Sequence, residues 1–188
     1  MFPTPKKVAF GMLVCTILVP AAFAGGSNPA LIKRGAELVA VAGCGDCHTP
    51  FKMGAHGPEK DVARGLSGHP EDLALPPPPQ LAAAWNWAGS ASMTAFVGPW
   101  GITYSPNLTP DKETGLGAVS EKAFVNSLRT GQHLDGKRPI LPPMPWQALS
   151  KLSDKDLKAI YAYLQAQPPV RNKVPAYQPP AGALTKAD

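Results

Sequence analysis

Cysteine is scarce in this chain, and charge is sparse. The 188 residues include only three cysteines, and none of them follows Cys47. A structural zinc site needs a second pair of ligands, so the missing cysteines argue against one. Only 16% of the residues are charged, and the formal net charge of +5 is scattered along the chain. So small and dispersed a charge argues against partners such as nucleic acid or an acidic membrane surface.

Repeats and strand patterns are also missing. No internal repeat is detectable, and alternating strand patterns are poor throughout, so no βαβ unit is predicted. The composition is otherwise that of a globular protein, with 44% hydrophobic residues, and the 23 prolines indicate many loops. The length suits one domain with one core.

The pentapeptide Cys44-Gly45-Asp46-Cys47-His48 carries the clearest chemistry. Two cysteines separated by two residues and followed at once by histidine are typical of c-type haem attachment. The thiols add to the two vinyl groups of the porphyrin, and the histidine then projects beneath the ring to bind iron. A thioredoxin-like redox pair shares the C-x-x-C spacing but belongs in a βαβ setting. The pentapeptide therefore predicts one haem c on Cys44 and Cys47, with His48 as an iron ligand.

Residues 1–24 have the pattern of a cleaved signal peptide. Lys6 and Lys7 precede an apolar stretch, and Ala22-Phe23-Ala24 forms a small-x-small cleavage site. The alternative is an uncleaved membrane anchor, but the apolar run is short for a full span. Cleavage would leave 164 residues with a formal charge of +3, before the haem propionates are counted. We therefore expect export to the periplasm.

Three helices are predicted from apolar periodicity and capping residues. The first covers residues 29–42, with Asn28 as its cap, and leads directly into Cys44. The second covers about 121–130, with Ser120 as its cap. The third begins at Ser153 and continues to about 165, where two prolines prevent further extension.

These features resemble a class I cytochrome c with one haem, and more narrowly the cytochrome c proteins and subunits that accompany bacterial periplasmic dehydrogenases. The matching segments are Arg34-Gly35, Gly43 through Pro50, Asn107 through Asp111, Leu128 through Gly131, Pro142 through Trp146 and Asp156 through Leu164. The resemblance implies a mostly α fold in which the first and last helices cross around the haem, with Gly35 packed against the Tyr161 region. It implies a single domain over residues 25–170, with a long proline-rich loop insertion over 68–99. Residues 171–188 are expected to form an extended or disordered tail.

The second iron ligand has several candidates, namely Met53, Met93, Met144, His56, His69 and His133. Two of them, Met53 and His56, follow His48 so closely that the chain could hardly reach the opposite face of the ring. Met144 has the best local setting, because flanking prolines stiffen the backbone and reduce the entropy lost on holding a flexible thioether. It also precedes the last helix by a short loop, as the resemblance implies. The prediction is therefore Met144, and the alternative is an ordinary buried core methionine.

The stretch 68–99 is larger than a minimal cytochrome needs. It contains four consecutive prolines, Pro76–Pro79, followed by Trp85, Trp87 and Phe96. One interpretation is a loop that wraps over one haem edge and packs on its own aromatics. The other is a docking surface for a redox partner, because tryptophan is enriched at the centres of interfaces.

The resemblance implies a periplasmic single-electron carrier, not an enzyme, that passes electrons from a dehydrogenase to a downstream cytochrome or oxidase. Its partners would be redox proteins, without nucleic acid, and a membrane would be reached only through a partner complex or an uncleaved signal anchor. A second hypothesis is a fixed subunit of a dehydrogenase or oxidase complex. A third is a haem-based sensor or catalyst that loses one axial ligand.

Overall fold

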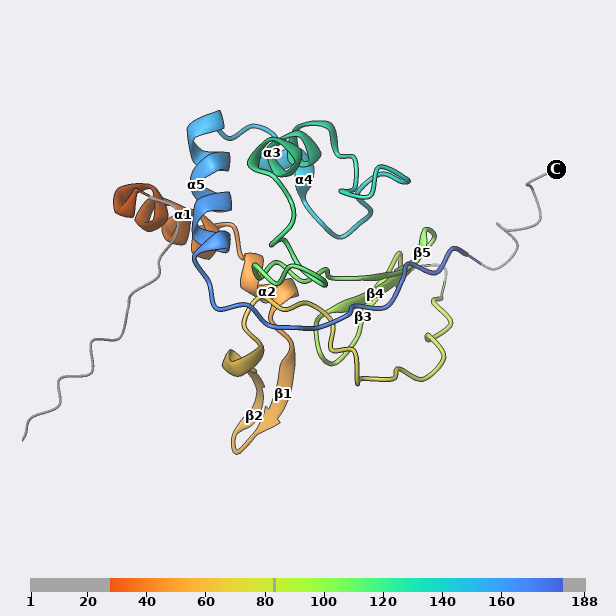
Figure 1. Cartoon of the computed structure of the whole chain (residues 1–188). Helices are drawn as coiled ribbons and strands as arrows, with labels where there is room; N and C mark the ends of the chain where they lie inside the picture. Colours follow the sequence, from red (N-terminus) through yellow and green to blue (C-terminus); the bar gives the residue numbers. More distant parts are fainter. Residues whose placement is uncertain (1–27, 83, 181–188) are drawn as a thin grey trace, which may run out of the picture.

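The computed structural model describes residues 28–82 and 84–180, and Figure 1 shows their arrangement. The expected signal peptide and residues 181–188 lie outside the described residues. The elements in chain order are α1 (Pro29–Val41), α2 (Cys44–His48), β1 (Phe51–Gly54), β2 (Gly57–Lys60), η1 (Val62–Arg64), β3 (Ala88–Gly89), β4 (Ala95–Gly98), β5 (Gly101–Tyr104), α3 (Glu121–Thr130), α4 (Trp146–Leu149) and α5 (Asp154–Gln165). No helix in this described part of the chain is both long and apolar enough to cross a membrane.

The first and last helices cross, as expected, and Gly35 is the point of closest approach. A Cβ at this position would lie 1.9 Å from the carbonyl oxygen of Ala159 and 2.6 Å from Cβ of Tyr163. The contact is therefore centred on the residues either side of Tyr161. Around it lies the core, in which Leu157 and Ala159 have no exposed surface. Figure 1 shows α1, α3 and α5 gathered in one part of the molecule.

The helix ends follow local chemistry. The side chain of Asn28 accepts a hydrogen bond from the Ala30 amide, and the Ser120 hydroxyl accepts one from the Ala123 amide. Gly131 ends α3 in the left-handed conformation, with φ +69°, where glycine is favoured. The three predicted helices are thus present, within one or two residues at each end.

The structure contains more strands than the sequence patterns indicated. β1 and β2 form an antiparallel hairpin, and β3, β4 and β5 form a three-stranded antiparallel sheet. The stretch 68–99, expected to be a loop insertion, therefore contains two strands of this sheet. These strands are two to four residues long, so alternation has too few positions to be recognised. Gly101, with φ +95°, closes the tight turn between β4 and β5.

Residues 170–180 form an extended segment, here called the strap, which runs from α5 towards the sheet (Figure 1). Asn172 is 5% exposed, and its side-chain nitrogen donates to the carbonyls of Ser67 and His69 at 2.7 and 2.8 Å. Further along, the backbone of Gln178 pairs with Ile102 of β5. The strap therefore ties the helical part to the sheet.

Candidate haem site

Helix α2 carries the C-x-x-C-H pentapeptide and directs His48 inward. The His48 side chain is 5% exposed, and its Nδ1 lies 2.9 Å from the carbonyl oxygen of Pro106. A carbonyl only accepts, so Nδ1 carries the hydrogen and Nε2 carries the lone pair. Burial lowers the pKa of His48, although the hydrogen bond to Pro106 acts in the opposite direction. A neutral imidazole with a free Nε2 is the form that binds iron.

The two thiols do not suit redox exchange. Burial raises the pKa of Cys44 to about 11, and burial with the nearby Asp46 carboxylate raises the pKa of Cys47. Thiol exchange needs a thiolate, and thioredoxin-like motifs lower the pKa of the attacking cysteine. Both cysteines are free and only partly buried, so neither is committed to a disulfide.

Met144 lies in the proline-rich loop before α4. It is partly buried and packs against the hydrophobic core. The Thr103 hydroxyl donates to the carbonyl of Pro142 at 3.2 Å, which attaches the Met144 loop to β5. Pro106, the hydrogen-bond partner of His48, follows Thr103 by only three residues, a span of about 10 Å at full extension. One short segment therefore holds both the His48 ring and the Met144 loop.

The other proposed second ligands are placed differently. Met53 is 77% exposed and Met93 is 39% exposed, and His56 is exposed at the tip of the β1–β2 hairpin. His69 is fully buried, with one ring nitrogen against the Thr94 hydroxyl and the other against the Leu73 carbonyl. His133 pairs with Asp135 at 3.0 Å. Among the six candidates, only the Met144 side chain is both partly buried and unoccupied by a hydrogen bond or ion pair in the described chain.

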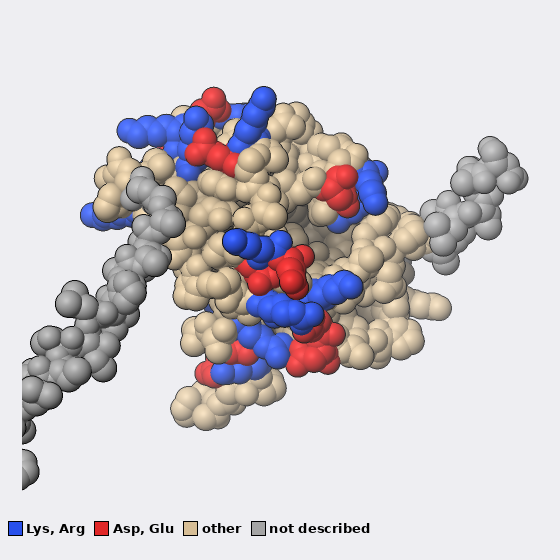
Figure 2. Space-filling model, in the orientation of Figure 1, with Lys and Arg blue, Asp and Glu red and all other residues tan. Residues whose placement is uncertain are grey.

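The indole nitrogen of Trp100, close in sequence to Thr103, is a buried hydrogen-bond donor without a partner among the described residues. Indole nitrogen can only donate, so it needs an acceptor oxygen. Trp100 lies in the β4–β5 turn, three residues before the link from Thr103 to the Met144 loop, and Figure 2 shows a hollow between the helical part and the sheet. A bound haem would bring two propionates, whose oxygens are acceptors of the kind that this indole lacks.

Sequence reasoning did not identify the supporting residues Trp100, Thr103 and Pro106. The contacts of Thr103 and Pro106 join segments 39 to 58 residues apart in sequence. No local pattern marks a hydroxyl that fixes a distant loop or a carbonyl that orients a distant ring. Only the tryptophan between Pro99 and Gly101 carried a signal, as an aromatic side chain in a tight turn.

Comparison with known families decides what the chain is. The family model described as cytochrome c matches residues 32–168, well over half of the chain. This chain belongs to the cytochrome c family. A cytochrome c domain implies haem c, which agrees with the pentapeptide and with the buried neutral imidazole.

Curated relatives of this cytochrome c domain come from bacteria. It is 32% identical to a nicotinate dehydrogenase subunit of Pseudomonas putida over 82% of this chain. It is 30% identical to the cytochrome c subunit of the quinone-type alcohol dehydrogenase of Gluconobacter oxydans over 90% of this chain. It is 38% identical to the fructose dehydrogenase cytochrome subunit of Gluconobacter japonicus over 72% of this chain. The chain spans only 10%, 29% and 21% of the lengths of these three relatives, respectively.

Proposed function

We propose that this cytochrome c domain carries single electrons through one covalently bound haem c. Cys44 and Cys47 are the tethers, and His48 and Met144 are the axial ligands. The observation that carries the proposal is the segment from Thr103 to Pro106, which holds the His48 ring through one carbonyl and the Met144 loop through one hydroxyl. The same segment would hold in place the two residues, His48 and Met144, that would bind the haem iron.

The chain's own residues set the electronic character of the site. When bound, the haem supplies a one-electron ferric–ferrous couple. The hydrogen bond from His48 Nδ1 to Pro106 fixes the tautomer and the ring orientation. Proline on both sides of Met144 restricts its loop, so both oxidation states can be held with little rearrangement. A thioether opposite an imidazole raises the potential and leaves no open iron position for oxygen chemistry.

The proposed donor is a dehydrogenase, and the proposed acceptor is a downstream cytochrome or oxidase. The names of the relatives, which are dehydrogenase subunits, support this assignment. A two-electron substrate oxidation then requires two successive single-electron transfers to the domain. We further propose export by residues 1–24 to the periplasm, where c-type haem is attached. The second candidate is a fixed subunit of a dehydrogenase complex, which the relatives' names also favour.

The axial assignment is tested by Met144→Ala in the haem-loaded protein. We expect loss of the weak near-infrared sulfur-to-iron band of the ferric form and a lower reduction potential, because the thioether is removed from iron. The matched control is Met93→Ala, which removes a thioether that is 39% exposed on the surface. That variant should keep both the band and the potential.

Two results would contradict the proposal. Retention of the band in Met144→Ala with its loss in Met93→Ala would transfer the assignment to Met93. Carbon monoxide binding to the ferrous wild-type protein at neutral pH would indicate an open or labile iron position and therefore a sensor or catalyst.

A further inference from the structure

An apolar groove lies on the face of the sheet that is turned away from the Met144 loop. Its volume is about 780 Å³, within the range of ligand- and segment-binding clefts. One wall is the proline run Pro76–Pro79, the floor includes Val97, Ile102 and Tyr104, and Pro175 of the strap also lines the groove. Proline has no backbone N–H, so the proline wall cannot pair with an added strand. An occupant of this groove must be held mainly by packing.

The groove is electrically neutral. From Leu73 to Pro110 the sequence contains no aspartate, glutamate, lysine, arginine or histidine. The two acidic residues at one end are each paired, Glu71 with Arg171 at 3.0 Å and Asp72 with Arg64 at 2.8 Å. His69 also lines the groove, but burial lowers its pKa and its ring nitrogens are both occupied. Nothing in the groove would attract a charged partner.

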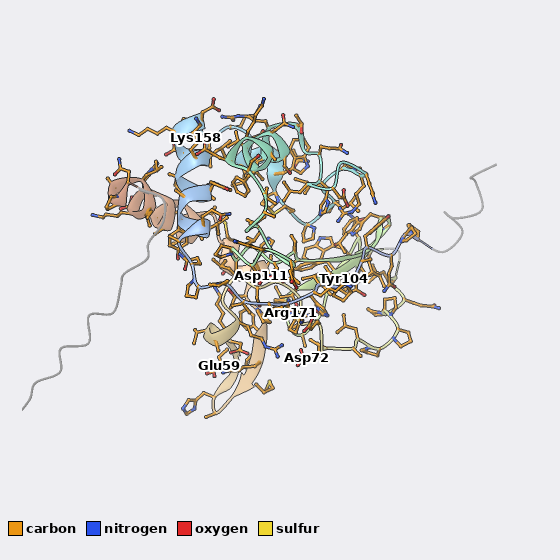
Figure 3. The ribbon with its side chains drawn as sticks, in the orientation of Figure 1. Glu59, Asp72, Tyr104, Asp111, Lys158 and Arg171 are labelled. Carbon is orange, nitrogen blue, oxygen red and sulfur yellow. The ribbon has the colours of Figure 1, made fainter. Side chains whose placement is uncertain are left out.

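The surroundings of the groove are apolar and exposed. Leu73 and Leu75, which line it, are 39% and 37% exposed. Figure 2 shows lysine, arginine, aspartate and glutamate from the centre of the visible face downwards, along its upper edge and in a small group at the upper right, whereas the area over the sheet is largely free of them. In Figure 3, Tyr104 lies at the sheet, while Asp72 and Arg171 lie towards this charged area. Interface centres are depleted in charge, as the lining of this groove is.

Strand β5 places the groove one layer from the proposed iron ligand. Successive side chains of a strand point to opposite faces. Ile102 and Tyr104 face the groove, and Thr103 between them donates to the Pro142 carbonyl of the Met144 loop. A molecule seated in the groove is therefore separated from that loop by a single strand.

We infer that the groove seats an uncharged, apolar segment of the donor dehydrogenase, an inference that rests on the proposed function. Because the groove is neutral, it is complementary to an uncharged segment. Because the groove is concave, that segment must project from the surface of the partner. Docking would bring the donor to the domain in which Cys44, Cys47, His48 and Met144 would hold the haem, and one electron would pass from the donor's reduced cofactor to the ferric haem.

The test introduces one charge at the groove and the same charge elsewhere. Leu75→Glu adds a carboxylate to the groove wall, and Val62→Glu adds one at a residue that is 84% exposed and outside the groove. The haem-loaded full chain is mixed with the dehydrogenase purified from the same source, and the second-order rate of haem reduction is measured by stopped flow. Leu75→Glu should lower the rate by about tenfold or more, because an unpaired charge would be buried on docking. Val62→Glu should match the wild type within about twofold.

Salt dependence provides the second readout. For the wild type, the rate should change by less than about twofold between about 0.1 M and about 1 M salt, because neutral surfaces are not screened. A steep fall with salt, together with equal rates for both variants, would overturn the inference and assign docking to the charged surface. Binding of the wild type, but not of Leu75→Glu, to phosphatidylcholine vesicles without any rate difference would assign the groove to a lipid surface. Failure of every dehydrogenase preparation to reduce the wild type would instead contradict the proposed function. Both variants must keep the wild-type haem spectrum.

Discussion

The crossing of α1 and α5 gives a sharp stability prediction for Gly35→Ala. The added Cβ would lie 1.9 Å from the Ala159 carbonyl oxygen, whereas ordinary Cβ contacts begin near 3.4 Å. The obstacle is backbone in the middle of a helix, so it cannot rotate away as a flexible side chain would. The two helices must therefore separate by roughly 1.5 Å, the difference between these two distances.

The net effect follows from two opposing contributions. Replacing glycine by alanine inside a helix stabilises the helix by about 0.5–1 kcal/mol. Overpacking a rigid core destabilises by about 1–3 kcal/mol or more, and here the separation also opens gaps around Leu157, which has no exposed surface. We expect a net loss of about 2 kcal/mol, which for a domain of this size lowers Tm by about 4–8 °C.

Thermal unfolding of the haem-loaded protein, followed by far-UV circular dichroism and by the Soret band, measures this change. The matched control is Gly45→Ala in α2, where a new Cβ would meet its nearest atom only at 3.6 Å. That variant should unfold at, or up to about 4 °C above, the wild-type temperature, because alanine is favoured over glycine in a helix and the new Cβ meets no close atom. If Gly35→Ala unfolded at or above the wild-type temperature, the close helix crossing and the reasoning from it would be wrong.

Two further predictions concern the cofactor and the strap. Acid denaturation followed by extraction with an organic solvent should leave the haem on the protein, because thioether bonds to Cys44 and Cys47 survive it; release into the organic phase would refute covalent attachment. Asn172→Ala removes hydrogen bonds to two buried carbonyls and should lower the free energy of unfolding by about 2–3 kcal/mol, seen as a lower urea midpoint with an unchanged m-value. The control is Asn126→Ala, at an exposed position, which should change the free energy of unfolding by less than about 0.5 kcal/mol. Equal urea midpoints for the two variants would show that the Asn172 hydrogen bonds do not stabilise the domain.

The helices were predictable because their signals are local. Caps such as Asn28 and Ser120 lie within three residues of the amides that they satisfy. The third helix shows the limit of this logic. The helix begins next to Ser153, as predicted, and the Ser153 hydroxyl accepts from the Asp156 amide, but the Asp156 side chain accepts from the Ser153 hydroxyl and pairs with Arg34 at 2.9 Å. Arg34 lies on α1, far from Asp156 in sequence, so the local pattern could not predict this ion pair.

The sheet and the support of the site could not be predicted in the same way. β3 has only two residues, and its pairing with β4 depends on a turn and on distant packing. For the site, the C-x-x-C-H spacing is a covalent requirement and is therefore readable from sequence. The contacts of His48 with Pro106 and of Thr103 with Pro142 join segments that only the folded chain brings together. Met144 as a ligand stays a prediction.

The strap also determines where this domain physically ends. The family match stops at Pro168, yet the next residues complete the hydrogen bonding of the domain interior. The Val170 carbonyl accepts from Asn107 Nδ2 at 2.7 Å, and its amide donates to the Thr109 hydroxyl at 3.0 Å. A chain cut at the family boundary would leave these buried groups without partners, so a unit that keeps these contacts must extend at least to Gln178, ten residues beyond the family match.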